Sequence, residues 1–209
     1  MRFAAGFLAA FVLWTAAVCA VNVQAIGPQG SAVGLAGFNR FVHGVTGVHM
    51  PLYVLTDALS LIPAGVCVGF GILGLVQWIQ RGSILKVDRS ILALGGFYLA
   101  VMAVYLLFEC VVVNSRPVLI DGRLEASYPS STTVLVLCVM GTALIQLKAR
   151  MKKSALRRRI SCAAIAFMVL MVAGRLISGV HWASDVIGGV LLSAGLVAAY
   201  DGVICRIEE

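Results

Sequence analysis

The sequence predicts an all-α protein: a polytopic bundle of six transmembrane helices, with an interfacial helix on the outer face between the first and second. Of its 209 residues, 61% are hydrophobic and only 12% are charged, against about 25% charged residues in an ordinary soluble domain. The mean hydropathy is +1.01. Apolar runs close to the ~20 residues that span a bilayer recur along the chain. No internal repeat interrupts this pattern, so we expect a single domain, residues 1–209.

Six apolar runs account for the predicted spans, and they cover residues 3–21, 59–79, 91–113, 133–147, 160–177 and 186–204. A cleaved signal peptide is the alternative for the first run, but its length favours a retained helix over the short apolar core of a signal sequence. The fourth run is short. It can extend backward through Ser130 to Thr132, or forward along the apolar stems of Lys148 and Arg150.

The segment 22–58 carries the predicted interfacial helix. Gly27-Pro28-Gln29-Gly30 marks a turn, and residues 32–43 then place apolar side chains loosely on one side at helical spacing. We therefore expect an amphipathic helix at the membrane surface. His43 and His49 flank a glycine-rich break after it, and we interpret them as interfacial histidines rather than catalytic ones.

Basic residues are distributed unevenly between the loops, and this predicts the topology. Loop 148–159 holds seven basic residues and no acid, and loop 80–90 holds three basic residues against Asp88. Both loops should face the cytoplasm, which places both termini there and the other loops outside. The net charge of +7 is then mainly an orientation signal, reinforced by membrane lipids with anionic headgroups, and no nucleic-acid partner is expected.

The six cysteines fall in six different apolar runs without any C-x-x-C pair. We interpret them as small buried hydrophobic residues, not as disulfides or metal ligands. The sequence therefore gives no reason to expect a metal or another cofactor.

Charge gathers at one place in an otherwise apolar part of the chain. The stretch Gly174-Arg175-Leu176-Ile177-Ser178-Gly179-Val180-His181-Trp182-Ala183-Ser184-Asp185 holds an arginine, a histidine and an aspartate. On a helix, His181 and Asp185 would share one face, so the carboxylate could accept the Nδ1 proton and leave Nε2 as a nucleophile or base. Arg175 could hold an anion beside that nitrogen.

A second polar cluster is predicted on the same outer face. It comprises Asn114-Ser115-Arg116-Pro117 and Tyr128-Pro129-Ser130-Ser131-Thr132-Thr133 at the head of the fourth helix. Hydroxyl residues at a helix start either cap its free amides or, with those amides, bind an anion. Two arginine forks with such amides would suit the oxygens of a phosphate.

At these residues the chain resembles the type 2 phosphatidic acid phosphatase (PAP2) superfamily of integral-membrane lipid phosphatases. Its third motif, S-R-x5-H-x3-D, is matched from Arg175 to Asp185, with Gly174 in place of the first serine. Its second, P-S-G-H, aligns with Pro129-Ser130-Ser131-Thr132, and its first, K-x6-R-P, aligns with Glu109-x6-Arg116-Pro117. The six-helix layout and the outward placement of the motifs are similar too.

The resemblance implies a role for each matched residue. His181 would be the nucleophile that forms a phosphohistidine, with Asp185 as its orienting carboxylate. Arg116, Arg175 and Ser130, with Ser131 and Thr132 beside it, would bind the substrate phosphate. Two of the family's role assignments fail. The histidine that serves as general acid is here Thr132, and the first lysine is here Glu109, which we expect to be protonated or paired with an arginine.

Two functions stay open on the sequence alone. The first is a lipid phosphatase that hydrolyses a lipid phosphate or diphosphate, such as a polyprenyl diphosphate, at the outer face of a bacterial inner membrane. The second is a catalytically weakened relative that binds lipid phosphate or a protein partner. Retention of His181 and Asp185 with both arginines favours the enzyme. A transporter is disfavoured because no paired Gly/Pro-interrupted helices are seen.

Overall fold

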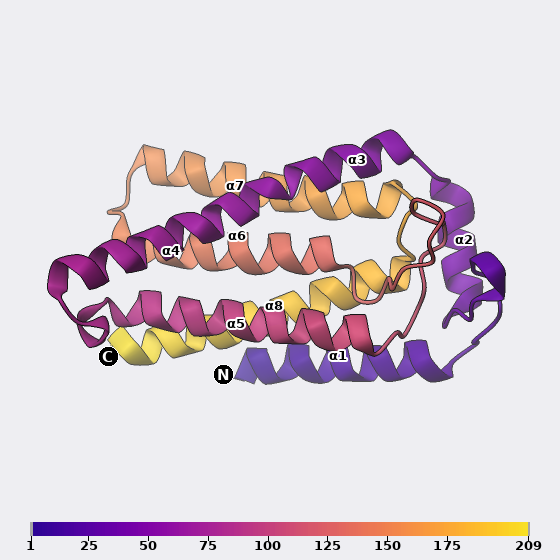
Figure 1. Cartoon of the computed structure of the whole chain (residues 1–209), viewed down its shortest axis with the longest axis horizontal. Coiled ribbons are helices and arrows are strands. Elements are labelled where there is room, and N and C mark those ends of the chain that lie inside the picture. The colour runs from indigo at the N-terminus through magenta and orange to yellow at the C-terminus, as the bar shows by residue number, and fades with distance from the viewer. Residues whose placement is uncertain (1, 209) are drawn as a thin grey trace.

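The computed structural model describes residues 2–208, which form helices and loops with no strand among them (Figure 1). The long helices run side by side along one axis. They are α1 (Arg2–Ala20), α4 (Leu61–Arg81), α5 (Arg89–Cys110), α6 (Ser131–Arg150), α7 (Ala155–Ile177) and α8 (Ala183–Glu208), with α2 (Ala36–Thr46) and α3 (Met50–Leu59) between α1 and α4 and short 3-10 turns at Pro28–Gly30 and Ile84–Lys86.

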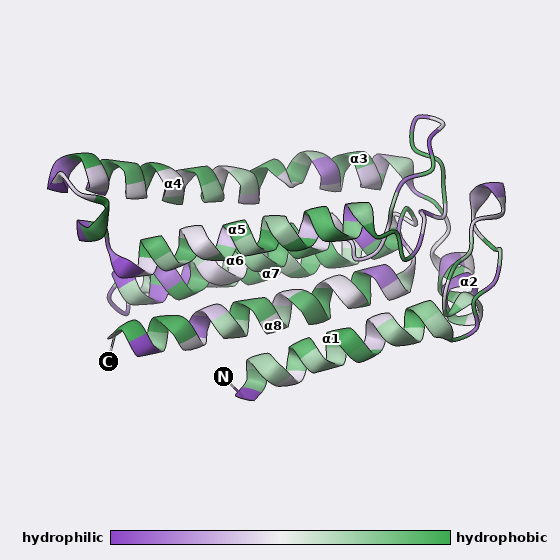
Figure 2. Ribbon diagram, turned by 60° about the horizontal axis from the view of Figure 1, so that its bottom comes forward, coloured by the Kyte–Doolittle hydropathy of each residue, from purple (hydrophilic) through white to green (hydrophobic). Residues whose placement is uncertain are grey.

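Six segments in this range are long and apolar enough to cross a membrane, which confirms the predicted all-α, six-span fold. Together they support a multi-pass membrane protein. Hydrophobic residues make up most of the long helices along their length, whereas hydrophilic residues concentrate at the helix ends and in the loops (Figure 2).

The second span is longer than the sequence indicated. It runs over Met50–Arg81, because α3 continues almost directly into α4. We had assigned α3 to the outer loop, since Asp57 interrupts the apolar run there. The backbone N–H of Ser60 nevertheless bonds to the carbonyls of Thr56 and Asp57, at 3.2 and 3.0 Å, so helical bonding persists through the junction.

Helix α2 is the predicted interfacial helix, shifted along the chain from residues 32–43. It begins at Ala36 because Leu35 takes a left-handed conformation, with φ of 49°. Phe38, Phe41 and Val45 are exposed at helical spacing on its outer side. Helix α2 crosses the end of the bundle instead of running along it (Figure 1). This orientation suits a helix that lies in the membrane interface.

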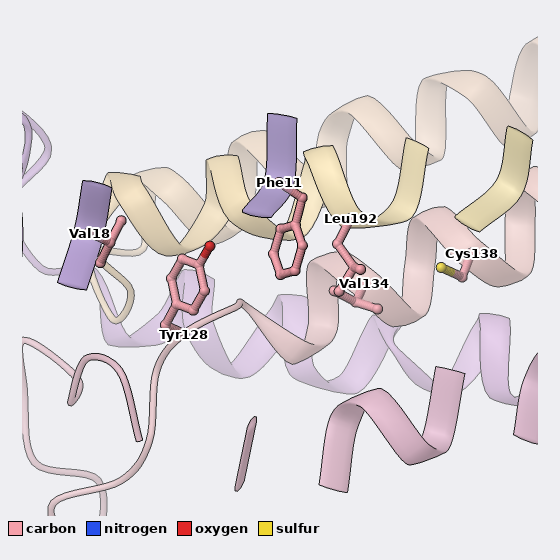
Figure 3. Packing of buried hydrophobic residues seen from close by; sticks show 6 residues of the cluster. All are labelled: Phe11, Val18, Tyr128, Val134, Cys138 and Leu192. Atoms are coloured by element: carbon pink, nitrogen blue, oxygen red, sulfur yellow. The ribbon is translucent and has the colours of Figure 1, made fainter. Parts of the chain in front are cut away.

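The core lies along α8, which packs against α1 and α6. Figure 3 shows the buried cluster of Phe11, Val18, Tyr128, Val134, Cys138 and Leu192 at this contact. The Tyr128 ring stacks on Phe11 with 6.2 Å between ring centroids, and its hydroxyl lies 2.6 Å from Thr15 Oγ1. A Cβ on Gly188 would overlap the Tyr128 ring, so glycine allows α8 to approach this closely. Tyr128 thereby fixes loop 111–130 to the bundle.

The cysteines are unpaired, as expected, but most are not buried. Cys138 alone is buried in the described part of the chain, and Cys67 is half-buried. Cys19, Cys110, Cys162 and Cys205 are exposed on helices predicted to face lipid. The burial prediction was wrong for these four because a side chain in a membrane helix can avoid water without entering the protein core.

The topology inferred from the basic loops can be tested by cysteine labelling. Both termini lie toward the end of the bundle opposite loop 111–130 (Figure 1). On a cysteine-free background, we expect Arg123→Cys to react with a membrane-impermeant thiol reagent in intact cells. Lys153→Cys should react only after the membrane is permeabilised. Its labelling in permeabilised cells is the control that shows that this cysteine is reactive. Both positions are exposed, whereas Ser184 is fully buried and would report poorly. The opposite labelling pattern would invert the topology.

Candidate active site

The residues singled out in the sequence meet at one end of the bundle. Arg116 comes from loop 111–130, Thr132 from the first turn of α6, and Arg175 from the last turn of α7. His181 lies in the short loop between α7 and α8, and Asp185 lies in the first turn of α8. Helix α3, which the sequence did not place here, packs against α7 beside them.

His181 is not on a helix, contrary to our expectation that it shares a helical face with Asp185. Helix α7 ends at Ile177, and Gly179 follows with φ of +68°, a conformation that favours glycine. Gly179 also packs so tightly against the Gly47 carbonyl that a Cβ would overlap it. This turn directs the chain back, and the His181 side chain is only 2% exposed.

The imidazole of His181 has a polar partner at each nitrogen. Nε2 lies 3.4 Å from Arg116 Nη1, and Nδ1 lies 3.0 Å from Ser127 Oγ. The Ser127 hydroxyl in turn donates to Asp185 Oδ2 at 2.6 Å. The carboxylate therefore reaches the imidazole through Ser127, where the sequence had predicted a direct bond. Ser127 was missed because nothing in the spacing of the motifs distinguishes it.

Asp185 is completely buried and accepts bonds from several donors. Besides Ser127, they are Asn114 Nδ2 at 2.8 Å, the Trp182 backbone N–H at 3.1 Å and Ser184 Oγ at 3.2 Å. These donors come from loop 111–130, from the His181 loop and from α8 itself. A buried carboxylate requires such satisfaction, so its position is strongly determined.

Arg175 is 1% exposed, and neighbouring side chains hold its fork. Nη2 donates to Thr132 Oγ1 at 2.5 Å, and Nη1 donates to Thr56 Oγ1 at 3.3 Å. The carboxylate of Asp57 lies 3.6 Å from Nη2. The Tyr53 ring covers the guanidinium, with 5.0 Å from Cζ to the ring centroid. Thus α3 closes this side of the site.

Arg116 shares the same aromatic neighbour and has its own carboxylate. Its Cζ lies 5.9 Å from the Tyr53 centroid, and its Nε lies 3.0 Å from Glu125 Oε2. That contact is an ion pair, but its angle does not make a hydrogen bond. Glu109, which we had expected to pair with an arginine if ionised, instead lies beside the Tyr105 hydroxyl.

Two unused donors remain in the site. In residues 2–208, three buried side-chain nitrogen or oxygen atoms lack a hydrogen-bond partner, and two of them are Nε of Arg116 and Nε of Arg175. Leaving a charged donor unsatisfied is costly. Both guanidiniums lie at the His181 end of the bundle, so an anion bound there would add acceptors to arginines that are incompletely hydrogen-bonded.

The hydroxyl residues at the head of α6 behave differently from one another. Ser130 makes no side-chain capping bond, contrary to the capping interpretation; its Oγ accepts a bond from Thr133 Oγ1 at 3.0 Å. Ser131 is half-buried at the wall of a cavity. Thr132 bonds Arg175, so it stands beside the guanidinium that the family resemblance assigns to phosphate binding.

His43 and His49 bond to backbone carbonyls near the site. His43 Nε2 lies 3.1 Å from the Gly179 carbonyl, and the imidazole packs on Trp182 with ring centroids 5.3 Å apart. His49 Nε2 lies 2.9 Å from the Thr46 carbonyl. That both are interfacial and not catalytic stays a prediction.

The electrostatic environment keeps His181 neutral. Burial lowers the pKa of His181 well below its ordinary value, and the nearby positive charges of Arg116 and Arg175 lower it further. A neutral imidazole keeps a lone pair on one nitrogen, and only that form can act as a nucleophile.

The site places a buried imidazole near two arginines at one end of a bundle of membrane helices. Such a combination is suited to bind an oxyanion. Residues 110–202 match the PAP2 superfamily. This range includes loop 111–130, α6, α7 and most of α8. The fold is similar to the crystal structure of a transmembrane PAP2-type phosphatidylglycerolphosphate phosphatase from Bacillus subtilis. The TM-score is 0.63 at 18% identity, over 99% of this chain and 98% of that one. No curated protein matches the sequence significantly. The likeness to the PAP2 superfamily thus extends over residues 110–202, in a chain whose six apolar helices support a multi-pass membrane protein.

The lowered pKa of His181 predicts the pH dependence of its imidazole. An ordinary histidine is half protonated near pH 6.5. Because the pKa of His181 is depressed, its neutral form should persist as the pH falls through 6.5, and protonation should occur only at lower pH. A ¹⁵N-histidine NMR titration of the detergent-solubilised protein would measure this directly, with free histidine as the reference. Protonation of His181 at or above pH 6.5 would contradict the prediction.

Proposed function

We propose that this protein is a membrane lipid phosphatase that cleaves a lipid phosphate or diphosphate through a phosphohistidine at the outer face of the membrane. The PAP2 superfamily match supports the phosphatase class, and the similar fold of the Bacillus subtilis phosphatase agrees with it. The basic loops support an outward-facing site and cytoplasmic termini. A bacterial inner membrane is the setting that the short loops favour.

One observation carries the proposal. The Nε2 atom of buried His181 lies against Arg116, and both site arginines have an Nε group with no hydrogen-bond partner. A phosphoryl group held by the two guanidiniums would have its phosphorus beside Nε2. Arginine forks match phosphate oxygens, and both guanidiniums are buried, so the attraction is strong.

An apolar cavity beside the site supports a lipid substrate. It lies against α5 and α6, has a volume of about 340 Å³, and is lined mainly by aliphatic and aromatic side chains such as Val101, Met102 and Phe108. Ser127, Ser131 and Thr132 contribute its polar lining. A hydrocarbon tail in this cavity would place the attached phosphate near the hydroxyl groups at the head of α6.

The reaction proceeds in two displacements. The Nε2 lone pair of His181 attacks phosphorus, an N–P bond forms, and the bond from phosphorus to the leaving oxygen breaks with its electron pair on that oxygen. Arg116 and Arg175 hold the charge on the transferring phosphoryl group. Water then attacks the phosphohistidine, which releases inorganic phosphate and restores the imidazole.

The leaving group decides which substrate suits this site. The residue at the family's general-acid position is Thr132, and its hydroxyl is too weak an acid to protonate an alkoxide at neutral pH. A lipid monophosphate, expelled from a diphosphate, needs no such proton, because its second ionisation has a pKa of roughly 6. We therefore propose a diphosphate, such as a polyprenyl diphosphate, as the preferred substrate. The alternative is that His43 or His49, on the outer interfacial segment, swings in as a substitute acid, but both are bonded to backbone carbonyls.

Removing the imidazole tests the nucleophile. His181→Ala should abolish release of phosphate from lipid diphosphate by purified protein, because it removes the nitrogen that attacks phosphorus. Asp185→Asn should lower kcat while lipid binding is largely retained, since it disturbs the orientation of the imidazole more than the arginines. A phosphoenzyme from ³²P-labelled substrate should be stable at high pH and labile in acid. Turnover in His181→Ala near the wild-type rate would refute the mechanism.

A comparison of substrates tests the leaving-group argument. Wild-type protein should turn over polyprenyl diphosphate faster than phosphatidic acid. Thr132→His should raise monoester turnover more than diphosphate turnover, by up to roughly 10²- to 10⁴-fold, the range of general-acid catalysis.

Equal wild-type rates on the two substrates would contradict the leaving-group argument. His43→Ala and His49→Ala serve as controls, because loss of monoester turnover alone in either would identify it as a substitute acid. Binding of both lipids without turnover would favour the catalytically weakened relative.

A further inference from the structure

The proton of His181 can be located from the hydrogen-bond partners alone. An arginine is always protonated and only donates, so Nε2, at 3.4 Å from Arg116 Nη1, must be the acceptor nitrogen. The proton of the neutral imidazole is then on Nδ1. Nδ1 lies 3.0 Å from Ser127 Oγ, whose single proton is directed to Asp185 at 2.6 Å. The chain of donors therefore runs from His181 through Ser127 to Asp185.

We propose that Ser127 is a positioning residue that transmits the orienting effect of Asp185 to His181. This inference rests on the proposed function and deepens it. The Ser127 hydroxyl accepts the Nδ1 proton bond while donating to the carboxylate, and the Ser127 backbone also bonds the imidazole, so this residue favours the tautomer with a free lone pair on Nε2. A direct carboxylate–imidazole bond is replaced by a three-member chain, and when the middle hydroxyl is removed Asp185 keeps its bonds from Asn114, Trp182 and Ser184.

Loop 111–130 holds Ser127 rigidly in this position. Its backbone N–H donates to the Asn114 carbonyl at 2.8 Å, and the Asn114 side chain donates to Asp185 at 2.8 Å. One asparagine thus fixes both the serine and the carboxylate. The next residue, Tyr128, is anchored on Phe11 and Thr15. Ser127 is buried, yet it also lines the apolar cavity, so it lies between the orienting carboxylate and the space for substrate.

The chain matters most during phosphoryl transfer. When the N–P bond forms at Nε2 and the electron pair leaves with the departing oxygen, the imidazole ring gains positive charge. The Nδ1 proton stays in place, and its bond to Ser127 shortens as the ring becomes a better donor. The negative charge of Asp185 stabilises this cation through the intervening hydroxyl, whose own proton also stays in place. Cooperative polarisation along such a chain strengthens each bond.

Substitution of Ser127 separates orientation from substrate binding. Ser127→Ala should lower kcat for lipid diphosphate by roughly 10- to 100-fold, by analogy with the loss of the hydrogen-bond partner behind a metal-bound histidine, with KM changed less than about twofold. Ser127→Thr keeps the hydroxyl and should retain more activity than the alanine variant. The matched control is Ser193→Ala. Ser193 is equally buried and donates to the Gly189 carbonyl at 2.7 Å, but it does not contact the site. Its turnover should equal the wild-type rate.

A spectroscopic readout tests the inference independently of activity. In ¹⁵N-histidine NMR spectra, protonated and unprotonated imidazole nitrogens resonate far apart, and the single variants His43→Gln and His49→Gln assign the other two histidines. Wild-type and Ser193→Ala protein should show His181 as the pure Nδ1–H tautomer. Ser127→Ala should show a mixture or the other tautomer. Thermal unfolding of each variant would establish that it is folded.

Each outcome has a definite meaning. An Nε2–H tautomer in the wild type would overturn the inference, and so would an unchanged tautomer or unchanged kcat in folded Ser127→Ala. If Ser127→Ala does not fold, the wild-type tautomer and the Ser127→Thr variant decide. A wild-type protein that lacks turnover but shows the Ser127-dependent Nδ1–H tautomer would support the positioning role and refute the proposed phosphatase function.

Discussion

Burial of the Asp185 carboxylate is the constraint on which the site end of the molecule depends. A carboxylate with no exposed surface is tolerated only when its oxygens are bonded, and here the donors come from Asn114, Ser127, Trp182 and Ser184. Loop 111–130 and the start of α8 cannot separate without leaving that charge unsatisfied. Ser184 extends the network to α2, because its backbone N–H and its hydroxyl both bond the buried Asn39 side chain at 3.0 and 2.9 Å.

The two site arginines differ from Asp185, because Nε of each lacks a hydrogen-bond acceptor. Arg175 is held by neutral hydroxyls and by an Asp57 carboxylate that is 58% exposed at 3.6 Å, a pairing too open to compensate a buried guanidinium. Arg116 likewise faces a half-exposed Glu125. The site therefore combines a fully satisfied negative charge at its base with incompletely satisfied positive charges beside the imidazole. That asymmetry is what makes an incoming oxyanion favourable at this point.

Hydropathy and charge were enough to predict the helices, because a bilayer imposes length and polarity on every span. The Arg175–His181–Asp185 spacing likewise indicated which residues the fold would bring together. The junction of α3 and α4 was not predictable, since Asp57 breaks the apolar pattern while the backbone stays helical. Ser127, Tyr53 and Thr56 were missed because they reach the site through tertiary packing of segments that no motif marks. The helical His181–Asp185 pair was wrong because the turn at Gly179 depends on its contact with Gly47, which lies far away in sequence.

The 32-residue span formed by α3 and α4 has a consequence for how a substrate would meet the protein. At 1.5 Å per residue it measures about 48 Å, against a hydrocarbon thickness of about 30 Å, so part of it projects into the headgroup layer or tilts. The end of this span beside Arg175 is α3, with Tyr53 and Thr56. For the lipid substrate proposed above, the phosphate would reach the arginines by lateral diffusion while its tail stayed in the bilayer. Saturation of the protein would then follow the mole fraction of that lipid in the leaflet, not its bulk concentration.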